Sequence, residues 1–155
     1  MLKTKLMRDI ITKHNPFFVQ NPDRLEVYVT EGNLIATGTA SPSFLYQYKL
    51  HVLALDYPAP LDSLSVPILE WARRHQPDLL FNPERRADGI KFDADILSDG
   101  TADILFVLRT TERVIVQTEN GQLTTQHLDE PPYPSASPKD HWGVLIDGAY
   151  SNDEK

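Results

Sequence analysis

Apolar residues recur along this chain with two different periods, and the longer period predicts two helices. Residues 2–14 and 62–75 each place their apolar side chains on one side of a helix. In the first segment the charged residues, including Lys3, fall on the opposite side. The second segment ends in a basic run, residues 73–75, whose charge suits the carbonyl end of a helix. We expect both helices to pack against one core.

The shorter period, an alternation of apolar and polar residues, predicts strands. The predicted strands cover residues 24–30, 34–40, 43–57, 90–97, 102–118 and 122–128, and the segment 102–118 is either one long bent strand or two consecutive ones. We expect the first two to form a hairpin around Gly32, with this glycine in the left-handed backbone region. Asn120 and Gly121 favour a type I′ turn between the last two. Residues 76–89 are predicted to be an ordered loop or a short helical turn.

The segment 43–57 is longer than a usual strand of about five or six residues. Its alternation puts Phe44, Tyr46 and Tyr48 on one face, while the opposite face of its first half is polar. Two interpretations are open. The strand projects beyond the core into solvent or a neighbouring subunit, or it is a long, twisted and half-buried strand.

The last part of the chain, residues 130–155, differs in composition from the rest. Four of the 12 prolines lie between Pro131 and Pro138, which excludes a helix or a central strand. An apolar run, Trp142–Ile146, follows, and a wholly disordered tail should lack one. We therefore predict an α+β domain over residues 1–129 and a Pro-rich extension over residues 130–155. The extension is expected to dock on its own domain or on a neighbour.

Composition narrows the function classes. The 155 residues carry 15 Lys and Arg against 22 Asp and Glu, a net charge of −7, and no cysteine. Disulfides, thiolate metal sites and cysteine nucleophiles are therefore excluded. The acidic balance argues against direct nucleic-acid binding, which needs clustered basic residues. No segment has the length and apolarity of a signal peptide or a membrane span, so we expect a soluble protein that stays in its cell.

No catalytic or metal-binding motif is present in the sequence. Phosphate loops, nucleophile elbows and paired metal-ligand histidines are all missing. His51 and His127 lie on predicted strands and could meet only through the fold. Asp93 and Asp95 share the polar face of a strand, opposite the alternating apolar residues Ile90, Phe92, Ala94 and Ile96. These carboxylates do not have the spacing of a calcium loop, although a small carboxylate-dependent hydrolase would use such residues.

Several short segments, taken in order, resemble one known family. They are Asn21–Leu25, Thr37–Ser41 leading into Phe44–Tyr48, Val66–Trp71, Gln76–Pro83, Thr111–Val116 and the Asn120–Gly121 turn. Their order and spacing are similar to those of the GpR-type tail completion proteins of temperate phages and prophages with contractile tails. The resemblance covers about residues 1–132 and does not include the segment around Trp142.

The resemblance implies a structural protein of the virion tail and not an enzyme. Such proteins are similar to tail terminators, which have a curved, mostly antiparallel or mixed β-sheet with two main helices. Tail terminators form a hexameric ring that caps the tail tube and sheath and meets the neck of the capsid. The implied partners are copies of the chain itself, tube and sheath proteins, and neck or head-completion proteins, without nucleic acid or membrane. Assembly is expected in the bacterial cytoplasm of the host.

A closed ring needs two different patches of one subunit that fit each other. The candidate interface residues are Tyr46, Tyr48, Arg85, Arg86, Arg109, Arg113 and Trp142. We expect no catalytic, cofactor-binding or metal-binding residue. Two alternatives remain open from the sequence, a small carboxylate-dependent prophage enzyme and an assembly adaptor that is absent from the finished virion.

Overall fold

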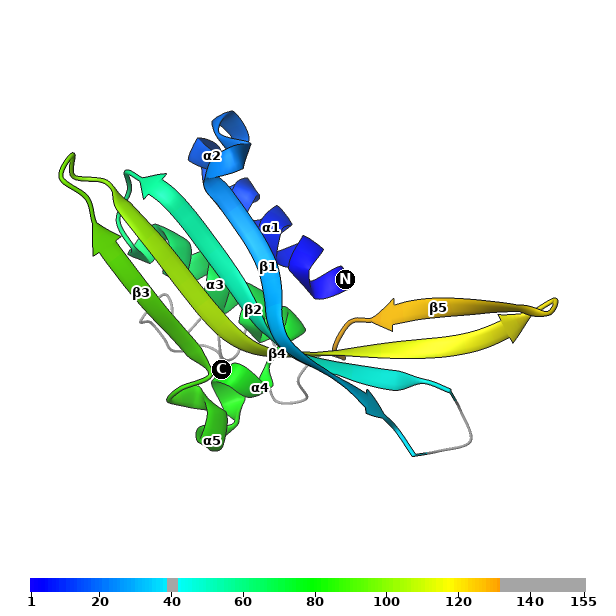
Figure 1. The fold of residues 1–155 in the computed structure, drawn as a ribbon. Helices are drawn as coiled ribbons and strands as arrows, with labels where there is room; N and C mark the ends of the chain where they lie inside the picture. Colours follow the sequence, from blue (N-terminus) through cyan, green and yellow to red (C-terminus); the bar gives the residue numbers. More distant parts are fainter. Residues whose placement is uncertain (39–41, 132–155) are drawn as a thin grey trace, which may run out of the picture.

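A computed structural model describes residues 1–38 and 42–131, which form a curled five-stranded antiparallel sheet with helices (Figure 1). The helices are α1 (Leu2–His14), α2 (Pro16–Gln20), α3 (Asp62–His75), α4 (Asp78–Phe81) and α5 (Pro83–Arg86), and a 3-10 turn, η1, covers Pro22–Arg24. The strands are β1 (Leu25–Ala36), β2 (Phe44–Tyr57), β3 (Ile90–Ile96), β4 (Ala102–Glu119) and β5 (Gln122–Leu128). Trp142 and nearly all of the predicted extension lie outside the described residues.

The predicted fold class is confirmed. All strand pairs are antiparallel, in the order β1-β2-β4-β3, with β5 also paired to β4. The two predicted helices are α1 and α3, and the predicted loop at 76–89 contains the short helices α4 and α5. The predicted type I′ turn is present as well, because Asn120 and Gly121 have φ angles of 52° and 80°.

The core lies between the sheet and the two long helices. Helices α1 and α3 pack against each other and lie behind the sheet in the view of Figure 1. Alternate residues of the two central strands point at these helices because successive side chains of a strand face opposite sides. The buried side chains include Met7, Ile11, Leu64, Ile68, Trp71, Leu50, Val52, Ala54, Ile104, Phe106 and Leu108.

The predicted hairpin at residues 31–33 is wrong. β1 runs without a turn from Leu25 to Ala36, and its partner is β2 throughout. The pairing shifts register between Thr30 and Asn33, which marks a β-bulge. Glu31, and not Gly32, takes the left-handed conformation, with a φ of 53°. The bulge bends β1 instead of reversing it, so the chain turns back only after Ala36.

β4 changes its neighbour along one edge. Its other edge pairs with β2, whereas this edge pairs with β3 as far as Leu108 and with β5 from Arg113 onward. Between them, Arg109 N–H donates to the carbonyl of Gly89 at 3.0 Å. Thr111 N–H donates to Gln76 Oε1 at 3.2 Å, and Lys3 Nζ donates to the carbonyl of Thr111 at 2.6 Å. One backbone carbonyl and two side chains thus take the place of a strand along this part of β4, between its pairing with β3 and its pairing with β5.

Lys3 is buried, which corrects the prediction that it faces solvent. Its side chain is fully covered, and its ammonium also donates to Gln76 Oε1 at 2.8 Å and pairs with Glu130 at 3.2 Å. Burial lowers the pKa of Lys3, and the nearby Glu130, Asp129 and Glu112 carboxylates oppose that shift. The helical period of the sequence cannot predict that Lys3 is buried, because the groups that accept its hydrogen bonds come from distant segments.

Glu112 is fully buried beside Lys3, at the first turn of α1. Its carboxylate accepts backbone N–H groups of Leu2 at 2.9 Å and Lys3 at 3.0 Å, together with the Tyr48 hydroxyl at 3.0 Å and His127 Nδ1. An anion is favoured there, because the N-terminal end of a helix is positive. Burial alone would raise the pKa of Glu112, but these hydrogen bonds outweigh it and lower the pKa.

Replacing Glu112 with Gln tests this buried carboxylate. We expect Glu112→Gln to lower the free energy of unfolding at pH 7 by about 1–3 kcal/mol, because two helix N–H groups lose a charged acceptor. Because the pKa of Glu112 is lower in the folded state, ionised Glu112 stabilises the fold at pH values above its ordinary pKa of 4.5. This stabilisation is lost as the pH falls below 4.5 and through the folded pKa. The difference between the variant and the wild type should therefore narrow below about pH 4.5, measured by urea unfolding.

The control is Glu119→Gln, which removes an exposed carboxylate near the β4–β5 turn and should leave stability within about 0.5 kcal/mol. A Glu112→Gln deficit that stays constant from pH 7 to about pH 3 would contradict the assigned pKa direction.

The surroundings of Gly89, beside the part of β4 that has no neighbouring strand on one edge, leave no room for a larger side chain. A methyl group on Gly89 would lie 2.5 Å from the Arg85 carbonyl oxygen and 2.6 Å from Leu79 Cδ2. We expect Gly89→Ala to lower the free energy of unfolding by about 1–3 kcal/mol, because the carbonyl that receives Arg109 N–H must move. Thermal unfolding measures this.

Gly32→Ala is the matched control. A methyl group there meets only Tyr48 Cβ at 3.9 Å and the Gln47 carbonyl oxygen at 4.0 Å, which are ordinary contacts. We expect a change within about 0.5 kcal/mol. Equal losses in the two variants would show that crowding at Gly89 is not the cause.

Candidate subunit interface

Two β-hairpin arms project from the body of the molecule (Figure 1). The β1–β2 arm consists of residues 33–36 and 44–47, beyond the bulge in β1. The β4–β5 arm consists of residues 113–128, closed by the turn at Asn120. Of the two interpretations of the long strand, projection holds for its first few residues, and the remainder is half-buried. The second half of β4 projects in the same way.

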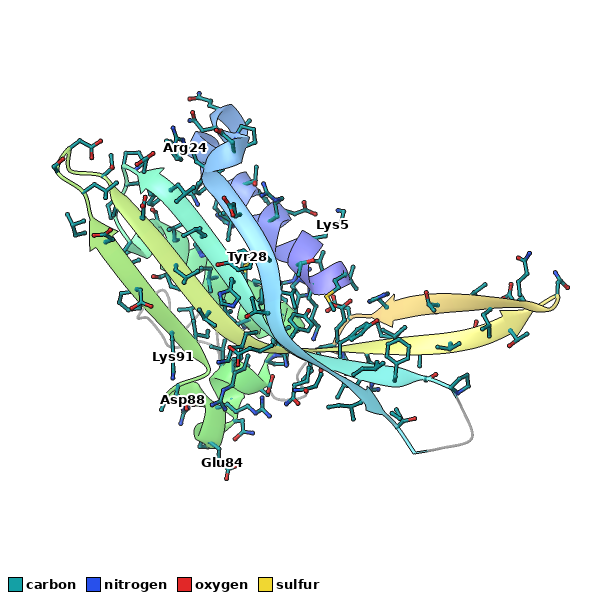
Figure 2. All side chains as sticks on the ribbon, in the orientation of Figure 1. Lys5, Arg24, Tyr28, Glu84, Asp88 and Lys91 are labelled. Atoms are coloured by element: carbon teal, nitrogen blue, oxygen red, sulfur yellow. The ribbon has the colours of Figure 1, made fainter. Side chains whose placement is uncertain are left out.

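The arms expose apolar side chains. Leu34 is 69% exposed and Leu123 is 72% exposed, and Ile35 is also exposed. Figure 2 shows side chains on both faces of each arm without a helix packed against them. Apolar residues on a projecting hairpin have no role in the core of their own subunit. Such residues are typical of a surface that another protein covers.

Aromatic side chains extend from the junction of the two arms along the β1–β2 arm. Phe44 and Tyr46 pack edge to face with ring centroids 5.0 Å apart, and Tyr46 stacks on His127 at 6.3 Å. Tyr46 is half-buried and remains accessible at the base of both arms. Tyr48 is only 3% exposed and bonds Glu112, so it supports the junction from inside.

The four arginines predicted for an interface fall into separate places. Arg85 and Arg109 line one hollow of about 290 Å³ and pair at 3.4 Å with Asp78 and Asp88, respectively. Arg86 is exposed and lies at a different, apolar groove beside α3. The structure therefore joins Arg85 to Arg109 but does not join either to Arg86. Figure 2 labels Asp88 near α5, where this part of the chain leads into β3.

Arg113 is exposed at the base of the β4–β5 arm. Across the described ranges it has no hydrogen-bond or ion-pair partner. Its neighbours across the ladders are Leu45 and Leu128, so its guanidinium projects from a largely apolar stretch of sheet. Of the predicted arginines, Arg113 is thus the one that belongs to a projecting arm.

The carboxylates and histidines considered for catalysis do not converge. Asp93 and Asp95 are exposed on β3. Asp99, a nearby carboxylate in the turn after this strand, accepts the N–H and hydroxyl of Thr101, which lowers its pKa. His51 bonds Thr30, whereas His127 bonds Glu112. Within residues 1–38 and 42–131, no three His, Asp or Glu side chains are grouped so that they could hold a metal ion.

Sequence reasoning missed Glu112 and the exposure of β3. The alternation along β4 could have indicated that Glu112 is buried, because Glu112 falls on the same face as the buried Phe106 and Leu108. The apolar alternation of β3 was read correctly, but Phe92 and Ile96 remain exposed at 54% and 73%. Alternation gives the face on which a side chain lies, and it does not tell whether another element covers that face.

Comparison with known proteins identifies the family. The family model described as P2 phage tail completion protein R (GpR) matches residues 1–131. Tail completion protein R of Escherichia phage P2 is 37% identical over 134 residues, which cover 86% of each chain. No solved structure matches the chain. No helix in the described part of the chain is long and apolar enough to cross a membrane.

These matches reject the alternative of a carboxylate-dependent enzyme, because the family is structural. They agree with the order of short segments from Asn21 to Gly121 that resembled this family in the sequence. The chain belongs to the GpR family of phage tail completion proteins, which are structural proteins and not enzymes.

Proposed function

We propose that this protein completes the tail as a hexameric ring that caps the tail tube and sheath and prepares the tail for joining to the head. The observation that carries the proposal is the pair of arms with exposed apolar residues, Leu34 and Leu123 among them. A ring size of six follows from the similarity to tail terminators. The protein would work in the virion tail after assembly in the host bacterial cytoplasm.

The shape of the subunit supports a ring. Subunits in a ring meet head to tail, so one patch must project and a different patch must receive it. The β4–β5 arm reaches beyond the core that α1 and α3 form with the sheet (Figure 1). Its tip therefore has access to the body of a neighbour and cannot bury itself against its own.

Charge supports the same arrangement. The chain has a net charge of −7, so a neighbouring subunit carries more acidic than basic side chains. Arg113 stands at the base of the arm and can meet acidic side chains of the next subunit. Charged pairs of this kind fix the orientation of an interface more than they add affinity.

The proposed partners follow from the position of a terminal ring. One face of the ring would contact tube and sheath proteins, and the other would contact neck or head-completion proteins. Contact with nucleic acid is not part of the proposal, because the net negative charge opposes phosphate binding. Membrane is not among the proposed partners either.

Reversing the charge of Arg113 tests the role of the β4–β5 arm. We expect Arg113→Glu to reduce ring formation about tenfold or more in native mass spectrometry of tail-assembly mixtures, because like charges then face each other. The melting temperature of the isolated subunit should hardly change, since Arg113 is exposed.

Arg74→Glu is the matched control, because Arg74 is an exposed arginine on α3 that belongs to neither arm. It should assemble like the wild type. Intact rings in Arg113→Glu would count against the arm as an interface. Equal losses in both variants would point to a general effect of charge instead.

A second experiment separates a ring that stays on the tail from an adaptor that leaves. We expect the protein in purified tails, in about six copies for each tail, measured by quantitative mass spectrometry against tube and sheath proteins. A major tube protein of known copy number serves as the internal standard. Complete tails that lack the protein would favour the adaptor and reject a terminal ring.

A further inference from the structure

An apolar groove runs along the outer side of α3, between this helix and the edge of the sheet. We call it the β3 groove, and it has a volume of about 310 Å³. Its lining includes Ile68, Leu69, Leu79, Leu80, Ile90 and Phe106. Helix α3 therefore covers the middle of the sheet but leaves the side nearest β3 open.

The floor of this groove continues along β3. Phe92 packs against Phe106 with ring centroids 5.9 Å apart, yet Phe92 is 54% exposed. Ile96 lies on the same face of the strand and is 73% exposed. A strand with one apolar face is typical of a sheet whose face is covered. Within the described residues nothing covers this one.

The backbone of β3 is unpaired as well. In the described part of the chain β3 bonds only to β4, so its outer edge carries free N–H and C=O groups. The seven residues Ile90–Ile96 form this edge. Natural proteins seldom leave an apolar edge strand bare, because it invites pairing with other chains. The site thus lacks both a strand and an apolar cover.

We propose that residues 142–146 of the same chain add to the outer edge of β3 as a further strand. The segment Trp142-Gly-Val-Leu-Ile146 alternates so that Trp142, Val144 and Ile146 share one face. Those three side chains fill the β3 groove and cover Phe92. Leu145 then points to the opposite face, away from the groove.

The segment that follows the described residues starts close to the β3 groove and is long enough to reach it. Glu130 lines a hollow beside α4 together with Phe81, while Leu79 and Leu80 of the same helix line the β3 groove. Crossing one helix requires about 10–12 Å. The 11 residues that follow Pro131, up to Trp142, can span up to about 36–40 Å.

Charge fits this placement. Asp140 and Asp147 flank the apolar segment on its two sides. Arg86 lines the groove, whereas Lys91 is exposed on the opposite face of β3, and neither has an ion-pair partner among the described residues. One acidic flank can therefore meet Arg86 at the groove, and the other can meet Lys91 on the opposite face of the strand. A second copy of the chain is less favoured in the groove, because a segment of the same chain binds without the entropy loss of bringing two molecules together.

Amide hydrogen exchange, followed residue by residue with NMR on the full chain, tests the proposal. The test concerns the free subunit at concentrations where light scattering gives a monomer, so it does not depend on ring formation. We expect protection of the β3 amides that point away from β4. Val144→Asp should increase their exchange by about tenfold or more, because a carboxylate cannot enter the groove. Leu145→Asp, one residue away, should leave it unchanged.

A variant on the receiving side completes the test. Phe92→Ser alters an exposed side chain, so the fold should persist, and it should raise exchange as Val144→Asp does. Equal exchange in the wild type and all three variants would overturn the proposal. Protection that appears only when copies associate would overturn it too, because the occupant would then be a second copy.

Discussion

On one edge of β4, four residues lie between the end of its pairing with β3 and the start of its pairing with β5. The backbone groups that point to this edge have no strand beside them and need other partners. Lys3 and Gln76 do this for Thr111, and the carbonyl of Gly89 does it for Arg109. An unpaired buried amide would cost about as much as a lost hydrogen bond, so the gap can exist only with these partners in place. The change of partner along β4, and with it the separation of body and arm, depends on this arrangement.

The same place joins the arms to the helices. Glu112 accepts hydrogen bonds from the first turn of α1, from Tyr48 of β2 and from His127 of β5. Both arms and the N-terminal end of α1 are therefore fixed to one buried carboxylate. A network with every member satisfied holds a single geometry, because each alternative leaves a buried polar group unpaired. The direction in which the arms project is thus set inside the body and not at their tips.

The sequence predicted the elements whose period is long and regular. Helices α1 and α3 and strands β2 and β4 match their predicted ranges closely, and the turn at Asn120 was read from two residues. Gly32 misled the prediction, since a glycine between two apolar runs is typical of a turn, whereas pairing with β2 continues past a bulge at Glu31. Lys3 could not be predicted, because its partners lie 73 to 127 residues away in the chain.

Two apolar surfaces remain on the described subunit, and they have different consequences for assembly. An open edge strand pairs with any other strand and propagates without closing, whereas a projecting arm engages one fitted patch. If both were free, a subunit such as this would have two competing ways to associate, one of which leads to fibres. Covering the β3 edge within the chain would leave the arms, with Leu34 and Leu123, as the apolar surface available to neighbours. An intramolecular strand at β3 would therefore favour a closed ring over open aggregation.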